Sequence, residues 1–213
     1  MNTIPTKEEM KEALIKRVGT EIQEKFSQGT VAVCGLGGLG SNIAISLARA
    51  GVGKLILVDF DTVDLSNMNR QQYKVSQIGK NKTEALTENL KEIAPYVEIE
   101  TWNVKAGEEN YGEILKEAQV VCEAFDVAEE KSILVNYVLE HMPEKYLIAG
   151  SGMAGMGSAN EIKTQKITKH FYLCGDGVSD VSKGESLFAP RVMICAAHQA
   201  LMALRVLAGQ YDI

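Results

Sequence analysis

Two basic residues and two carboxylates have types and positions that suit the binding of a nucleoside triphosphate. Arg70 lies in the polar run Ser-Asn-Met-Asn-Arg-Gln, and Lys82 follows twelve residues later. An arginine can grip phosphate oxygens with two parallel hydrogen bonds, and a lysine adds a point charge. Asp59 and Asp126 each follow a short apolar run that predicts a buried strand, and open α/β sheets bind ligands at the carboxyl ends of their strands. These side chains are therefore expected to share one phosphate-binding site.

A glycine-rich turn precedes this polar run and is expected to hold the nucleotide. It consists of Gly35, Gly37, Gly38 and Gly40. The apolar run 30–34 precedes the turn, and the helical segment 41–50 and a second apolar run, 54–58, follow it, which predicts a βαβ unit. Glycines let the backbone approach a ligand, and Asp59 is placed to accept hydrogen bonds from ribose hydroxyls. The glycines and Asp59 fit a nicotinamide-dependent oxidoreductase equally well, so that alternative stays open.

The glycine turn and the Ser-Asn-x-x-Arg-Gln element at 66–71 together resemble the ThiF/MoeB/HesA family, the bacterial relatives of the ubiquitin-activating enzymes. The resemblance runs from about residue 31 to 207 and is greatest to the short ThiF enzymes of thiamine biosynthesis. It implies an ATP-dependent adenylyltransferase that activates the C-terminal carboxylate of a small ubiquitin-like sulfur carrier ending in Gly-Gly. A carrier of molybdopterin synthesis and a non-catalytic carrier-binding module are the alternatives within this resemblance.

The resemblance also implies a role for each matched residue. Asp59 is expected to hold the ribose, while Asp61 either assists it or fixes the turn. Contacts to the phosphates are expected from Asn67, Arg70, Gln71 and Lys82. Asp126 is expected to hold the Mg²⁺ of MgATP, in a sequence Phe-Asp-Val where the family has Thr-Asp-Asn. The other interpretation of Asp126 is a cap for the helix expected from about residue 128.

Two further roles follow from the resemblance alone. Arg17 is expected to reach the triphosphate bound by a partner subunit, which implies a homodimer; the alternative is a solvated charge on a helix. Cys174 opens the polar stretch 175–188, which is expected to be a mobile loop. It is therefore expected to be an accessible thiol that forms a covalent intermediate. The alternative is a small buried hydrophobic residue.

The remaining pattern predicts one α/β domain over residues 1–213, a Rossmann-like, mostly parallel sheet flanked by helices. Residues 1–28 are predicted to form a helical segment before the first strand. An antiparallel extension near the C-terminus is predicted from the alternating runs 161–167 and 169–174. The glycine-rich run 150–158 is expected to let another backbone lie close, such as the tail of a peptide substrate.

Composition narrows the class of protein. The chain is 46% hydrophobic and 23% charged, as in soluble globular proteins, and its net charge of −6 argues against nucleic acid as a partner. No stretch approaches the roughly 20 consecutive apolar residues that span a membrane, so a cytoplasmic protein without a membrane partner is expected. Four scattered cysteines without a Cys-x-x-Cys pair favour free thiols and give no sign of a zinc site.

Overall fold

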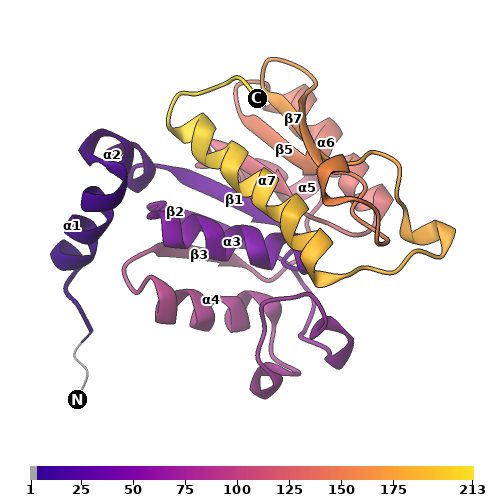
Figure 1. Cartoon of the computed structure of the whole chain (residues 1–213), viewed down its shortest axis with the longest axis horizontal. Coiled ribbons are helices and arrows are strands. Elements are labelled where there is room, and N and C mark those ends of the chain that lie inside the picture. Colours follow the sequence, from indigo (N-terminus) through magenta and orange to yellow (C-terminus); the bar gives the residue numbers. More distant parts are fainter. Residues whose placement is uncertain (1–3) are drawn as a thin grey trace.

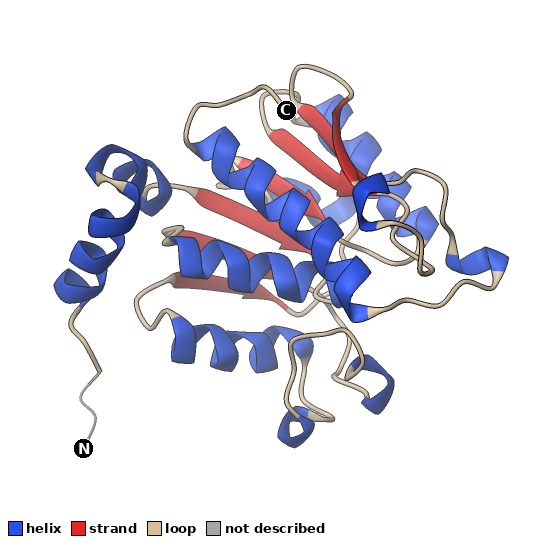
Figure 2. Cartoon of the chain, in the orientation of Figure 1, coloured by secondary structure: helices blue, strands red, loops and turns tan. Residues whose placement is uncertain are grey.

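The computed structural model describes residues 4–213, which form one seven-stranded sheet in the order β3-β2-β1-β4-β5-β7-β6 (Figure 2). The strands are β1 Thr30–Cys34, β2 Lys54–Val58, β3 Glu98–Trp102, β4 Val120–Glu123, β5 Tyr146–Gly150, β6 Lys163–Lys166 and β7 Phe171–Gly175. All neighbouring strands are parallel except β6, which runs antiparallel to β7 at one edge. The predicted mostly parallel sheet with an antiparallel extension is confirmed.

Helices cover both faces of this sheet. They are α1 Lys7–Val18, α2 Thr20–Ser27, α3 Gly38–Ala50, α4 Lys82–Ile93, α5 Glu108–Ile114, α6 Ala128–His141 and α7 Ala189–Leu207. Helices α3, α4 and α7 lie on the face toward the viewer in Figure 1, and α5 and α6 lie behind it. Successive strand residues point to opposite faces, so Val31 and Val33 pack in the first layer while Ala32 and Cys34 pack in the second.

The first two helices lie apart from these layers, beside the amino ends of the central strands (Figure 1). Thr6 caps α1 by accepting a hydrogen bond from the Glu9 backbone N–H, and Glu9 bonds back to the Thr6 N–H. All twelve residues of α1 are described and none of them is buried. The helix is therefore fixed by its own caps and by α2 more than by the core.

No helix of residues 4–213 is long and apolar enough to cross a bilayer.

The glycine turn between β1 and α3 allows the closest backbone approach in this part of the fold. Gly35 has φ +90°, a conformation that favours glycine, and a Cβ there would lie 2.7 Å from the Ala124 backbone. A Cβ on Gly40 would lie 1.8 Å from the Gly35 carbonyl oxygen. The first turn of α3 therefore packs directly on the turn that precedes it, and this contact sets the position of the helix amino terminus.

We expect Gly40→Ala to lower the free energy of unfolding by at least about 2 kcal/mol, because the added methyl group meets backbone that cannot move aside. Urea denaturation followed by circular dichroism measures this. Arg49→Ala, on the exposed side of the same helix, is the control and should change stability by no more than about 0.5 kcal/mol. Equal stability of the Gly40 variant and the wild type would show that the turn has room to adjust.

Candidate active site

A cavity of about 580 Å³ lies at the carboxyl ends of the central strands. Nine of the residues predicted to bind nucleotide, phosphate or metal line it: Gly35, Gly37, Gly38, Asp59, Asp61, Arg70, Gln71, Lys82 and Asp126. They come from four segments, namely the turn after β1, the end of β2, the polar run with the start of α4, and the end of β4. The sheet therefore brings together residues as far apart in the sequence as Gly35 and Asp126.

Lys82 is the most enclosed cation of the cavity. It is the first residue of α4, and its side chain is 8% exposed. Its Nζ lies 2.7 Å from Asp61 Oδ2 and 3.7 Å from Asp59 Oδ2. Asp59 also accepts hydrogen bonds from the Leu36 backbone N–H, at 2.7 Å, and from the Asp61 N–H, at 2.8 Å. Burial raises the pKa of Asp59, against the attraction of Lys82 and these two hydrogen bonds.

Arg70 and Gln71 enter the cavity from the polar run. The Arg70 guanidinium donates to Asn69 Oδ1 at 2.8 Å and stays half-buried. Gln71 is buried, and its Oε1 has no hydrogen-bond partner among residues 4–213. A buried acceptor without a partner is costly, so a bound molecule with an O–H or N–H group would satisfy it. This observation favours a polar ligand at this point of the cavity.

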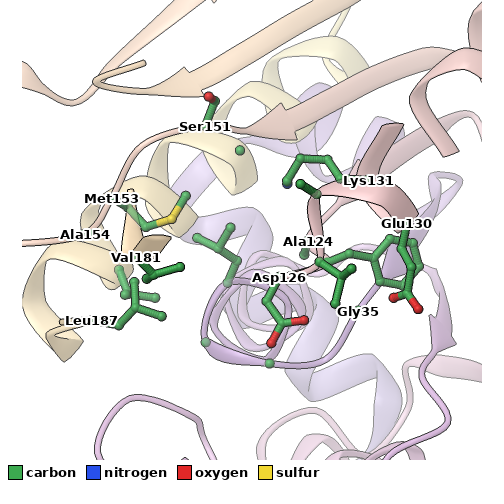
Figure 3. A pocket seen from close by; sticks show the side chains of 18 of the residues that line it. Gly35, Ala124, Asp126, Glu130, Lys131, Ser151, Met153, Ala154, Val181 and Leu187 are labelled. Carbon is green, nitrogen blue, oxygen red and sulfur yellow. The ribbon is translucent and has the colours of Figure 1, made fainter. Parts of the chain in front are cut away.

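Asp126 is exposed and directly follows the end of β4. Figure 3 shows it between Gly35 on one side and Val181 and Leu187 on the other. The alternative that Asp126 caps α6 is wrong, because Val127 occupies the cap position and no side chain donates or accepts a capping bond there. The carboxylate is thus left available to a ligand.

The run 150–158, predicted to let another backbone lie close, reaches the cavity as well. Gly150, Ser151, Gly152, Met153 and Ala154 all line it. A later segment, the predicted loop 175–188, reaches the same cavity through its residues 177–181. This loop contains a single short helical turn, Val181–Lys183. The mobility expected of this loop stays a prediction.

Residues 10–213 match the ThiF family over nearly the whole chain. The chain belongs to the ThiF family. A molybdopterin-synthase adenylyltransferase from Haemophilus influenzae is 33% identical over 202 residues, which cover 92% of this chain and 82% of that protein. Ubiquitin-like modifier-activating enzyme 5 from Caenorhabditis elegans is 48% identical, over 80 residues that cover 38% of this chain and 19% of that enzyme.

The E. coli tRNA N6-threonylcarbamoyladenosine dehydratase, crystallised with ATP, superposes with a TM-score of 0.85 at 19% identity, covering 97% of this chain and 98% of that one. At this identity the likeness shows the fold alone. The family assignment and the 33% identical relative confirm the enzyme class predicted from the sequence, an ATP-dependent adenylyltransferase. They give no support to the oxidoreductase alternative.

Four other predicted site residues of this ThiF-family chain lie outside the cavity lining. Gly40 acts through the packing of α3. Asn67 accepts a hydrogen bond from the Asp64 backbone N–H at 2.9 Å and so closes the short helical turn Leu65–Asn67 before Arg70. Arg17 is exposed in the last turn of α1. That helix lies beside the amino ends of the central strands (Figure 1), whereas the cavity lies at their carboxyl ends.

Cys174 is the fourth, and the expectation that it is an accessible thiol is wrong. Strand β7 continues to Gly175, so the side chain of Cys174 lies within the sheet and has no exposed surface. Its Sγ lies 3.5 Å from Thr164 Oγ1, and the Cys195 thiol donates to its carbonyl. Burial raises the pKa of Cys174 to about 11, so the thiol is protonated at neutral pH.

An ion pair between the buried Glu123 carboxylate and Lys131, which lines the cavity and is 27% exposed, was not predicted. Glu123 ends β4 with no exposed surface, and its carboxylate pairs with Lys131 of α6 and accepts a hydrogen bond from the Phe125 N–H at 2.8 Å. Burial raises the pKa of Glu123, against the attraction of Lys131. The sequence does contain a signal for this ion pair, because a glutamate ends an otherwise apolar strand and a lysine follows eight residues later. The pair fixes the loop that carries Asp126.

Because all four cysteines are buried, we expect no thiol of the native protein to react quickly with Ellman's reagent, and all four to react in guanidinium chloride. Absorbance at neutral pH measures the number of reactive thiols. As a control, Cys174→Ser should lower the denatured count by one and leave the native trace unchanged. A rapid native phase that this variant abolishes would mean that Cys174 becomes exposed in solution.

Proposed function

We propose that this ThiF-family enzyme uses MgATP to adenylate the C-terminal carboxylate of a small ubiquitin-like carrier protein that ends in Gly-Gly. The observation that carries the proposal is the convergence of Arg70, Lys82 and Asp126 on one glycine-lined cavity. A site that only held a carrier would need no such set of charges around a phosphate-sized space.

The residues present fit ATP. The amino terminus of the thirteen-residue helix α3 faces the cavity through Gly37 and Gly38, and a helix amino terminus with bare backbone N–H groups suits phosphate. The free acceptor of Gln71 suits a ribose hydroxyl or an amine of the base. The cavity volume lies within the roughly 300–1,000 Å³ range of small-molecule sites.

Asp126 fits Mg²⁺ as a single carboxylate ligand. Residues 4–213 contain no group of three or more His, Cys, Asp or Glu side chains that could hold a metal ion by themselves. Mg²⁺ is commonly bound by one or two carboxylates together with substrate phosphates and water, so one aspartate beside a phosphate site is a sufficient protein contribution.

In the reaction, a carboxylate oxygen of the carrier forms a bond to the α-phosphorus of ATP, the bond to the bridging oxygen breaks, and pyrophosphate leaves. Arg70 and Lys82 hold positive charge where negative charge grows, with Lys82 kept in place by Asp59 and Asp61. Phosphoryl-type transfer needs little covalent help, so orientation and charge supply most of the rate.

Two kinds of carrier protein are candidates for the substrate. The resemblance of the sequence to short ThiF enzymes favours a sulfur carrier of thiamine biosynthesis, activated for later sulfur transfer. The 33% identical relative is named for molybdopterin synthase, which makes the carrier of that pathway the second candidate.

The functional unit is proposed to be a homodimer in which Arg17 contacts the triphosphate of the partner subunit. Arg17 is exposed on α1, and this helix lies beside the amino ends of the central strands (Figure 1), opposite to the cavity, so a contact of Arg17 with nucleotide would use the cavity of another copy. The lack of buried residues in α1 leaves that helix free to pack on a second subunit.

We expect ATP–pyrophosphate exchange that requires Mg²⁺ and a carrier with an intact Gly-Gly terminus. Asp126→Ala and Arg70→Ala should each lower the exchange rate by about 100-fold or more, because Arg70→Ala removes a positive charge beside the reacting phosphate and Asp126→Ala removes the proposed Mg²⁺ ligand. Arg49→Ala is the control and should exchange at the wild-type rate. Binding of ATP without exchange for any carrier, or binding of NAD in place of ATP, would contradict the proposal.

Mixing two inactive variants tests the dimer. In the proposed dimer, each site takes Asp126 from one subunit and Arg17 from the other. A dimer of one Arg17→Ala subunit and one Asp126→Ala subunit therefore contains one site with both substitutions and one site with neither. After subunit exchange we expect recovery of about a quarter of wild-type activity, since half the dimers are mixed and half their sites are intact. If both residues act within one subunit, mixing restores nothing.

A further inference from the structure

Arg191 is a buried cation that the proposed chemistry does not use. It lies in the first turn of α7 and is 6% exposed. Its Nε donates to the Ala154 carbonyl at 3.0 Å, and its Nη1 donates to the Ser158 carbonyl at 2.8 Å and to the Gly157 carbonyl. One guanidinium thereby binds three carbonyls of the glycine-rich segment 150–158, all within residues 154–158.

The same guanidinium holds a second segment, 176–183. Its Nη2 forms an ion pair with Asp176, and Glu161 lies 3.5 Å from the same nitrogen. Asp176 Oδ1 in turn accepts hydrogen bonds from the Val178 and Ser179 backbone N–H groups, both at 2.8 Å. Burial acts to raise the pKa of Asp176, but these hydrogen bonds and that from Arg191 outweigh it and lower the pKa to about 2. The carboxylate therefore stays ionised at neutral pH.

The two segments also bond directly to each other. The Asp176 N–H donates to the Gly152 carbonyl at 2.9 Å, and the Gly177 N–H donates to the Ser151 carbonyl at 3.0 Å. Gly152 has φ +80°, and a Cβ there would lie 2.0 Å from Asp176 Oδ1. Segments 150–158 and 176–183 are therefore joined to each other, and we call them together the clasped wall. Their residues 150–154, 177–181 and 183 line the cavity.

The clasped wall lies on the opposite half of the sheet from the phosphate-binding residues. Arg70, Lys82 and Asp59 come from segments around β1 and β2, whereas the clasped wall follows β5 and β7. Asp126 follows β4, between the two halves. A nucleotide bound by Arg70, Lys82 and Asp59 would leave the half of the cavity beside the clasped wall free for the carboxylate that attacks it.

The surface of the clasped wall is mostly small and uncharged. Apart from Asp180 and Lys183, its lining residues are glycine, serine, alanine, valine and Met153. Figure 3 shows Met153, Ala154 and Val181 together on the side of the cavity away from Gly35. Such a surface accepts the close approach of a peptide backbone that has no side chains.

We propose that Arg191 is a positioning residue for the carrier, which acts by holding the clasped wall in the shape that receives the Gly-Gly tail. The inference rests on the proposed function and deepens it, because it assigns the carrier and the nucleotide to different residues of one cavity. Arg191 itself touches neither reactant.

The test separates carrier binding from nucleotide binding. Asp176→Asn keeps the side-chain shape and the two backbone hydrogen bonds but removes the charge that faces Arg191. In carrier-dependent exchange with the full-length protein, we expect KM for the carrier to rise by about tenfold or more, while kcat and KM for ATP change by less than about threefold. Arg191→Lys keeps the charge but loses the fork of carbonyl contacts, so its carrier KM should lie between those of the wild type and Arg191→Met.

A second readout does not depend on catalysis. Lys183 is exposed in the clasped wall, so trypsin should cleave after it about tenfold faster in Asp176→Asn than in the wild type. Asp212→Asn, an exposed position near the carboxyl terminus, is the matched control and should leave cleavage, both KM values and the melting temperature unchanged.

Unchanged carrier KM in Asp176→Asn, or an equal rise in KM for ATP, would overturn the positioning role even if the wild type is active. Unchanged cleavage after Lys183 would overturn the clasp. Absence of exchange in the wild type with every carrier contradicts the proposed function itself, and the wild-type measurement alone reveals that outcome.

Discussion

The ion pair that Lys82 makes with Asp59 and Asp61 holds together the half of the cavity that the proposed function assigns to the nucleotide. Asp59 also binds the Leu36 backbone N–H, so the same group of atoms connects the glycine turn, the end of β2 and the start of α4. A lysine enclosed to this degree is tolerated only because two carboxylates compensate its lost hydration. Loss of the Asp59 carboxylate would leave Lys82 with Asp61 as its remaining partner and would also release the Leu36 backbone N–H of the glycine turn.

Strand order gives the cavity two halves, which the proposed function assigns to two reactants. The chain runs from β1 outward to β2 and β3, then returns to place β4 on the other side of β1. Loops at such a reversal diverge to opposite faces and leave a crevice between them, where open α/β sheets bind ligands. Asp126 follows the first strand after the reversal, so it lies between the charged half and the clasped wall.

Local patterns in the sequence were sufficient to predict the sheet and to predict that most of the proposed nucleotide-binding residues lie in one cavity. Apolar runs such as 30–34 and 54–58 report burial directly, and the glycine turn has a fixed spacing, so Asp59 and Asp126 could be placed at strand ends. The prediction that Cys174 is accessible was wrong because the strand was predicted to end at residue 174, whereas β7 continues to Gly175. A difference of one residue at a strand end separates an exposed loop thiol from a buried one. Arg191 could not be found because its partners lie 15 to 37 residues away and no periodic pattern connects them.

The burial of all four thiols has a consequence for the later fate of the product. On the proposed function the enzyme releases pyrophosphate and retains a reactive acyl-adenylate, but no cysteine of the chain is exposed to bring sulfur to it. Sulfur must then arrive on a separate donor, which approaches the cavity while the carrier tail is still held there. The enzyme would then bind the carrier and the sulfur donor in succession. Its yield of sulfur-loaded carrier would depend on how long the acyl-adenylate survives hydrolysis before the donor binds.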